Sequence, residues 1–194
     1  MTPVDHPRTN TRAEILKLAE GLFQTKGYNG FSYSDISSVL GIKNAAIHYH
    51  FPSKAELGVA LIRRYRDLLK ATSGTFMKTG ENPRAQLEGY LLFCAKREQT
   101  TDYICPIAIT ANDYMTLPKT MQDEGIKLSR ETLAWLTRIL QEGREQGVFT
   151  FDGYPADKAI LIQGALQGAG ELCRLKNPGA MDATTRQIKS DLSV

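Results

Sequence analysis

The sequence predicts an all-α protein, and three observations support this fold class. Apolar residues recur at three- and four-residue spacing through most of the 194-residue chain, which is the period of a helix that buries one face. No segment sustains the alternation of apolar and polar residues that predicts a strand. Glycines, prolines and capping residues separate the periodic segments at intervals typical of helices.

The first expected helix follows an arm of about eight residues that contains two prolines. Thr9 or Asn10 can cap its start, because a short polar side chain there accepts a hydrogen bond from a free backbone N–H. Gly27 ends the helix, as glycine often does just past the last turn. The apolar spacing defines one buried face, which comprises Ile15, Leu18, Ala19, Leu22 and Phe23.

A second, short helix is expected between Ser32 and Gly41. Asp35 follows Ser32 at the spacing with which two polar residues cap a helix start. Gly41 breaks the helix, because glycine readily adopts the conformations of a tight turn. The residues expected to face inward are Ile36, Val39 and Leu40, with Ile42 seated inward in the turn.

A third helix is expected to begin at Ala45 and to end before Pro52, because proline disfavours helical geometry in the preceding residue. Ile47 is its expected core anchor. The helix is otherwise aromatic and histidine-rich, and it carries too little apolar surface to serve only as a core helix. Two short helices joined by a glycine turn are typical of a helix-turn-helix, whose second helix enters the DNA major groove.

The remaining chain is predicted to be helical throughout. Ser53 and Glu56 have capping-box spacing and open a long fourth helix that reaches Gly74 or beyond. Its expected apolar stripe comprises Leu57, Leu61, Tyr65, Leu68 and Leu69. Further helices are expected over about 83–99, 107–114, 118–147 and 156–175, with a short one from 182. We predict a helix-turn-helix domain over residues 1–54 and a helical domain over residues 55–194.

Charge and cysteine usage narrow the setting and the partners. Residues 1–70 hold ten basic and six acidic side chains, whereas the rest holds 14 basic and 15 acidic ones. This excess of positive charge suits a polyanionic partner. The three cysteines form no disulfide framework, and no signal segment or membrane span is recognised, so we expect a cytoplasmic protein without a membrane partner. No cofactor is expected.

No motif indicates an enzyme or a metal site. The chain lacks a Walker loop, a G-x-S-x-G nucleophile turn and an H-E-x-x-H zinc helix. His48 and His50 point to nearly opposite sides of a helix, which is poor geometry for binding one metal ion. The glycines at 164, 168 and 170 do not form a nucleotide-binding loop, because no strand precedes them and the G-x-G-x-x-G order is absent.

Several motifs within residues 11–60 fall together at a recognisable spacing. They are Thr11-Arg12-x-x-Ile15-Leu16, Ala19-x-x-Leu22-Phe23, Lys26-Gly27-Tyr28, Ser32-x-x-Asp35-Ile36, Val39-x-Gly41-Ile42 and Ile47-x-Tyr49-His50-Phe51-Pro52-Ser53-Lys54-x-x-Leu57. With these motifs the chain resembles the TetR/AcrR family of bacterial transcriptional repressors. Its Cys105-Pro106 segment is similar to that of the LmrA/YxaF branch.

The resemblance implies a homodimeric transcriptional repressor that binds double-stranded DNA. One helix-turn-helix unit per subunit reads one half of a near-palindromic operator. The C-terminal helical domain binds a small-molecule effector and holds the dimer together. Effector binding changes the separation of the two reading units, and the protein leaves the DNA.

Positions in the family motif imply which residues contact DNA. Asn44, Ala45 and His48 are expected at base edges, where asparagine pairs with adenine and the alanine methyl meets thymine. The other residues of the expected DNA surface are Ser32, Ser34, Lys43, Tyr49, His50 and Lys54, with Arg8 and Arg12 reaching the backbone from the arm. Positions 43, 44 and 48 differ from the commoner family residues, which suggests an unusual operator. Tyr49 can alternatively pack in the core, and for Phe51 core packing is the expected role.

The C-terminal half yields a candidate pocket and a candidate interface. The expected effector-binding set, for which ordinary core packing is the alternative, is Tyr90, Phe93, Cys94, Cys105, Ile109, Tyr114, Trp135 and Gln163. The expected dimer interface comprises Gly164, Ala165, Gly168, Ala169 and Leu172, since glycines four apart let another helix approach closely. Cys105, ahead of a helix start, is also a candidate redox or electrophile sensor. The alternative function is a small-molecule-binding or redox-sensing protein that binds no operator.

Overall fold

The computed structural model describes residues 11–78, 82–98 and 104–192, and this part of the chain is helical without a strand. The predicted all-α fold class is therefore confirmed. Its helices are α1 (Thr11–Lys26), α2 (Tyr33–Leu40), α3 (Asn44–His50), α4 (Lys54–Lys78), α5 (Pro83–Glu98), α6 (Pro106–Asn112), η1 (Tyr114–Thr116), α7 (Lys119–Glu145), α8 (Pro155–Arg174) and α9 (Ala180–Asp191).

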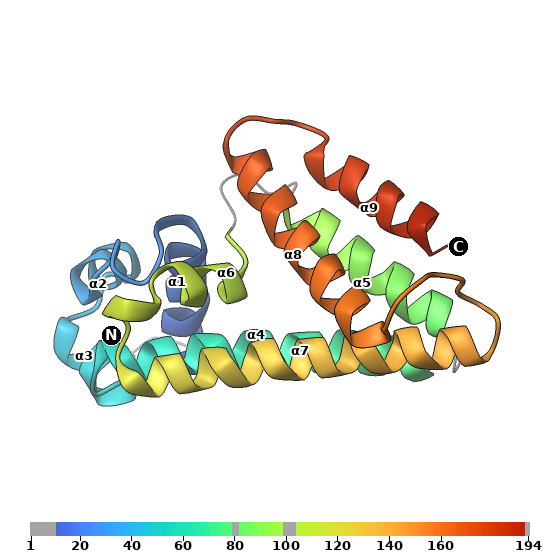
Figure 1. Ribbon diagram of the computed structural model, residues 1–194. Coiled ribbons are helices and arrows are strands. Elements are labelled where there is room, and N and C mark those ends of the chain that lie inside the picture. The colour runs from blue at the N-terminus through green and yellow to red at the C-terminus, as the bar shows by residue number, and fades with distance from the viewer. Residues whose placement is uncertain (1–10, 79–81, 99–103, 193–194) are drawn as a thin grey trace, which may run out of the picture.

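Two long helices form the base of the molecule. In Figure 1, α4 and α7 run side by side, with α1, α2 and α3 at one end and α5, α8 and α9 towards the other. The short helix α6 lies between these two groups and packs on α7. The long pair therefore connects the helix-turn-helix to the larger helical part.

Most predicted boundaries agree with the structure to within about two residues. The largest differences are of two residues. The helix expected over 107–114 ends at Asn112 and is followed by the separate 3-10 turn η1, and α9 begins two residues earlier than expected. The third helix begins at Asn44, with extended Lys43 as its N-cap residue. The predicted cap at Thr9 or Asn10 lies outside the described residues.

A first core fills the space under the helix-turn-helix. It contains Ile15, Phe23, Phe31, Ile36, Ile47 and Phe51, and continues through Leu57, Leu61, Ile62 and Tyr65 of α4 to Met121 and Leu128 of α7. This core spans both sides of position 54/55, so the domain boundary drawn there stays a prediction. Phe51 is 3% exposed, which confirms the expectation that it packs inside.

Two predicted inward residues are corrected by the packing. Val39 is 70% exposed, because the buried face of α2 follows Tyr33 and Ile36, roughly a quarter-turn away. Leu68 is also exposed, and the inward position at that turn of α4 is Leu69, which packs against both cores. In both cases the helical period was right and the orientation was set by the neighbouring helices.

A second core is built where α5, α7, α8 and α9 meet. It contains Leu87, Leu91, Leu136, Ile139, Leu140, Phe149, Ile162, Leu166, Met181 and Ile188. Phe149 lies on the turn after α7 and is 1% exposed. Its ring packs against the backbone of Gly143, and its N–H donates to the Gly143 carbonyl at 3.0 Å.

Gly143→Ala is expected to destabilise the protein by about 1–3 kcal/mol, the usual cost of forcing extra volume into a packed core. A methyl group at position 143 would lie 2.1 Å from Cδ2 of the buried Phe149 ring, so the ring must move. Gly21→Ala in α1 is the matched control, because its methyl group meets no atom within 4 Å. That variant should gain about 1 kcal/mol from helix propensity. Chemical denaturation of both variants tests the contrast, and equal stabilities would contradict it.

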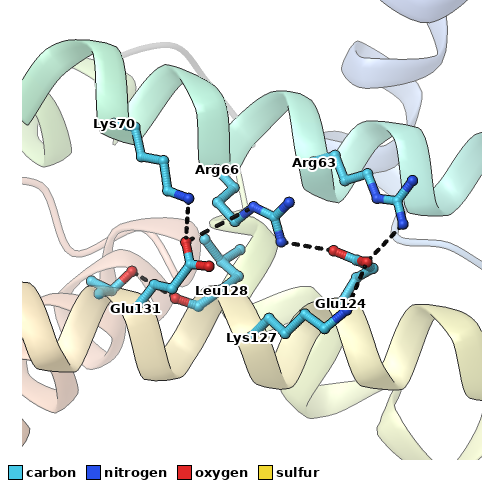
Figure 2. Close-up of polar contacts among 8 residues, drawn as sticks. Arg63, Arg66, Lys70, Glu124, Lys127, Leu128 and Glu131 are labelled. Carbon is cyan, nitrogen blue, oxygen red and sulfur yellow. Dashed lines mark hydrogen bonds and ion pairs between the residues drawn. The ribbon is translucent and has the colours of Figure 1, made fainter.

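An ion-pair network links the two long helices. Glu124 of α7 is 4% exposed, and its carboxylate accepts hydrogen bonds from Arg63 and Arg66 of α4, each at 2.8 Å. Lys127 lies at 3.3 Å from the same carboxylate, and Figure 2 shows these side chains meeting between the helices. Further along α4, Lys70 pairs with Glu131 at 2.8 Å. Glu124 is therefore the buried centre of the α4–α7 contact.

Acid should weaken this contact. The pKa of Glu124 is lowered to about 2, and the hydrogen bond from Arg63 is the largest cause. A depressed carboxylate pKa stabilises the fold above the unfolded value near 4.5, and this contribution is lost as the pH falls from there to about 2. Glu124→Gln should cost about 3 kcal/mol at neutral pH and flatten the stability profile in that window. Glu131→Gln, at a 42% exposed side chain, should change stability by under about 1 kcal/mol. Urea unfolding across pH measures both, and parallel profiles for Glu124→Gln and the wild type would contradict this.

Candidate functional site

The helix-turn-helix is fixed by local capping. The Asp35 carboxylate accepts hydrogen bonds from the backbone N–H and the hydroxyl of Ser32, both at 2.7 Å. The hydroxyl contact is the main reason that the pKa of Asp35 is lowered. At the other end of α2, Gly41 adopts φ +65°, a left-handed conformation that favours glycine. This turn directs the chain from α2 into α3.

Helix α3 presents one face to solvent and anchors the opposite face. Ile47 is fully buried in the first core. Asn44, Ala45, His48 and Tyr49 are all exposed, and Tyr49 is 83% exposed. A large aromatic side chain left in water on a short helix is not explained by core packing. The alternative in which Tyr49 belongs to the core is therefore ruled out for this structure.

Aromatic contacts hold the end of α3 against α2. The buried Tyr33 hydroxyl donates to the Phe51 carbonyl at 2.7 Å, and burial, followed by the charge of Glu56, raises the pKa of Tyr33 to about 12. The Tyr33 ring also meets the His48 ring edge-on, with centroids 4.8 Å apart. These contacts fix the orientation of the outward face before any partner binds.

The other residues of the expected DNA surface lie in different surroundings. Ser34 and Lys43 are exposed beside α3, whereas His50 is half-buried and packs edge-on against Tyr49. The Ser32 hydroxyl is engaged by Asp35. Arg12 is exposed and lies over the Phe51 ring at 4.9 Å. Arg8 lies outside the described residues.

Lys54 is turned towards the protein. Its ammonium donates to the Phe31 carbonyl and lies over the rings of Tyr28 and Phe31, at 4.6 and 4.7 Å from their centroids. Burial lowers the pKa of Lys54, with Asp35 opposing the shift. A phosphate contact by Lys54 therefore stays a prediction, and it requires the ammonium to leave the Phe31 carbonyl.

A pocket opens between α5, α6 and α8. Five of the eight residues expected there line it, namely Tyr90, Phe93, Cys94, Cys105 and Gln163. Cys105 is the N-cap residue of α6, and its sulfur lies 3.5 Å from the Tyr65 hydroxyl. Gln163 is 7% exposed. The pocket walls are therefore mostly aromatic and aliphatic, with polar groups contributed by α8.

Three expected pocket residues lie elsewhere. Ile109 belongs to the first core, Tyr114 lies in η1, and Trp135 packs edge-on against Tyr90 behind the pocket wall, at 5.2 Å between centroids. The sequence reasoning missed lining residues from α4, the α6 segment and α8, which include Tyr65, Ile104, Gln167, Gly170, Glu171 and Arg174. The missed residues of α8 follow Gln163 at helical spacing and therefore lie on or near its face of the helix. Extending the prediction of Gln163 along that face could have found them.

The outer face of α8 is apolar and uncovered in the single chain. Ile160, Leu161 and Leu172 of α8, together with Leu175 directly after it, are 49–74% exposed. A methyl group added at Gly164 or Gly168 would meet no atom within 4 Å, so packing within the chain does not require these glycines. Ala165 is exposed on the same side. Ala169 corrects the expected set, because it is 2% exposed and packs into the second core.

The described helices give no sign of a membrane segment or a metal site. Over residues 11–78, 82–98 and 104–192, none combines the length and apolar character needed to cross a bilayer. Across the same residues, no three histidine, cysteine, aspartate or glutamate side chains come together in a way that could bind a metal ion.

Comparison with known proteins agrees with the helix-turn-helix geometry. Residues 15–61 match the model for bacterial regulatory proteins of the tetR family. The chain is 24% identical over 174 residues to the HTH-type transcriptional repressor NemR of Escherichia coli, covering 84% of each protein. It is 27% identical over 143 residues to the repressor KstR2 of Mycobacterium tuberculosis, covering 73% of this chain and 70% of KstR2.

A solved structure extends the similarity over almost the whole chain. The TetR-family transcriptional regulator of Agrobacterium tumefaciens superposes with a TM-score of 0.87 at 32% identity, covering 93% of this chain and 96% of that protein. The likeness thus includes both the helix-turn-helix and the helical part that carries the pocket. With an exposed α3 on such a scaffold, the chain belongs to the TetR family and is a DNA-binding transcriptional regulator.

Proposed function

We propose that this regulator is a repressor that binds a near-palindromic operator as a homodimer and leaves it when a small molecule enters the pocket. The observation that carries the proposal is the outward face of α3, which is exposed on a helix held rigidly from behind. The repressor function is supported by the names of NemR and KstR2, which are both described as transcriptional repressors.

The proposed DNA contacts follow the exposed face. Asn44, Ala45 and His48 would meet base edges, since they lie on the solvent side of the helix that enters the groove in this motif. The Tyr49 hydroxyl would donate a hydrogen bond to a phosphate oxygen. Lys43 and Ser34, exposed beside it, would add contacts along the same backbone. Asparagine pairs with adenine in two hydrogen bonds, so Asn44 would carry most of the sequence specificity.

The proposed dimer contact is the outer face of α8. Exposed leucine and isoleucine side chains flank Gly164 and Gly168, and each glycine inside a helix costs about 1 kcal/mol relative to alanine. A second copy of α8 lying close across this face would bury the apolar side chains and make use of the small glycines. Such a contact on a two-fold axis gives one pair of reading units per operator.

Two hydrogen bonds, one between backbone groups and one between side chains, join the first helix and the turn after it to the α6 segment and η1. The pocket residue Ile104 donates its N–H to the Gln24 carbonyl of α1 at 2.8 Å. Asn29, in the turn after α1, donates to the Thr116 hydroxyl of η1 at 2.9 Å. A ligand that displaces the 104–108 segment would therefore pull on α1, and the α3 orientation would change with it.

A gel-shift experiment tests the proposal. The purified protein is titrated against DNA taken from upstream of its own gene and against a shuffled duplex, each at 50 and 200 mM salt. Preferential binding to the upstream DNA that weakens steeply with salt is expected, because phosphate contacts release counterions. Sedimentation of the free protein should give a dimer.

The alternative function predicts a different outcome. Equal and weak binding to both duplexes, together with a ligand or oxidant response of the free protein, would favour a sensor that binds no operator. In that alternative the responding thiol would be Cys105, which lines the pocket. Cys105→Ala, compared with the wild type after electrophile treatment, separates a thiol response from simple ligand binding.

A further inference from the structure

One buried polar atom at the pocket has no hydrogen-bond partner among the residues that the structure describes. Gln163 of α8 is 7% exposed, and its Oε1 is buried and accepts no hydrogen bond. Buried side-chain oxygens almost always have a partner, so an exception at a cavity wall indicates a group that a ligand can satisfy. In the described part of the chain, three other side-chain atoms share this state, on Arg66, Gln86 and Trp135, and none of those residues lines the pocket.

The walls around Gln163 define the rest of the ligand. Tyr65, Tyr90 and Phe93 contribute three aromatic rings, with Ile104 and Met181 beside them. Aromatic walls favour a flat ring, which they can contact edge-on or in offset stacking. A ligand body with one aromatic ring fits this chemistry.

Charge at the pocket argues for a neutral molecule. Among the lining residues that the structure describes, the charged ones are Glu171 and Arg174, which lie three residues apart on α8 and carry opposite signs. Their charges cancel, so this described lining offers no net charge that would compensate an ionic ligand. A carboxylate would also present only acceptors to the Gln163 oxygen, which needs a donor.

We propose that the pocket binds a compact neutral aromatic alcohol, whose hydroxyl donates a hydrogen bond to Gln163 Oε1. A hydroxyl group both donates and accepts, so it can also engage the amide nitrogen of the same side chain. This inference rests on the proposed function, in which the pocket is the effector site, and it specifies the chemical class of that effector.

The test compares benzyl alcohol, toluene and benzoate as probes of the full-length protein. Trp135 is the only tryptophan of the chain and packs against Tyr90, one ring behind the pocket, so its fluorescence reports binding. Benzyl alcohol should bind about tenfold more tightly than toluene, the usual size of one hydrogen bond's contribution. Benzoate should bind more weakly than benzyl alcohol.

Matched variants assign the effect to one side chain. Gln163→Leu removes the amide at nearly constant size, and the tenfold preference for benzyl alcohol over toluene should disappear. Gln86→Leu is the control, since Gln86 is also buried with an unpartnered Oε1 and lies outside the pocket. It should keep the preference. Equal affinities for benzyl alcohol and toluene in the wild type, or an unchanged preference in Gln163→Leu, would overturn the inference.

The DNA readout separates this inference from the proposed function. Benzyl alcohol binding that depends on Gln163 but leaves the operator complex intact supports the ligand class and contradicts the effector function. Release of operator DNA by toluene and benzyl alcohol at equal concentrations supports the effector function and contradicts the ligand class.

Discussion

Leu161→Glu is expected to convert the protein from a dimer into a monomer and to weaken operator binding by at least about a hundredfold. Leu161 lies on the outer face of α8 between other exposed apolar side chains and is 65% exposed in the single chain. The proposed two-fold contact would bury both copies of the introduced carboxylate near one another. Burying charges without partners costs several kcal/mol, enough to separate the subunits.

The loss of DNA affinity follows from the loss of the link between two reading units. In a dimer, binding of one unit places the second near its half-site at an effective concentration in the millimolar range. A monomer binds each half-site independently and loses this advantage. The subunit itself should remain folded, because substitutions at solvent-exposed positions usually change stability by less than about 0.5 kcal/mol.

Leu92→Glu is the matched control for this experiment. Leu92 is a 53% exposed leucine of α5, so the same charge is added to an apolar surface position away from the outer face of α8. Sedimentation velocity should show a monomer for Leu161→Glu and a dimer for Leu92→Glu, with gel shifts following the same order. A dimeric Leu161→Glu protein would place the interface elsewhere.

Local signals explain why the helix-turn-helix could be predicted from sequence. Each of its main features depends on only a few neighbouring residues: the Ser32–Asp35 cap, the left-handed turn at Gly41 and the helix end before Pro52. Ile47 is the one large apolar residue in α3, so its burial and the exposure of the opposite face follow from the helical period. A short helix with one anchor leaves little freedom in orientation.

Long-range packing explains the predictions that were wrong or incomplete. Val39 and Ala169 lie near the edge of an apolar face, where a small rotation of the helix decides between core and solvent. Lys54 meets the Phe31 carbonyl, 23 residues away, which no local pattern indicates. Trp135 and Ile109 are residue types that often line ligand pockets. The packing of α5, α6 and α7 instead places Ile109 in the first core and Trp135 against the second.

Asn44→Ala is expected to cause the second large loss, about two to four orders of magnitude in operator affinity. A good two-bond contact between an amide and a base contributes about 1–3 kcal/mol, and a dimer makes it twice. The loss should be confined to the cognate operator, because an asparagine at a base edge adds little to nonspecific binding. Substituting the base pair that Asn44 reads should then cost the variant almost nothing.

Tyr49→Phe on the same helix provides the contrast. Removing the hydroxyl of this 83% exposed side chain would delete one phosphate contact per subunit and leave every base contact in place. Its affinity should fall by a similar factor of about ten on cognate and shuffled duplexes, with specificity unchanged. If Asn44→Ala behaved in that uniform way, Asn44 would be positioning the helix on the backbone, and sequence discrimination would have to come from His48 or from the shape of the DNA.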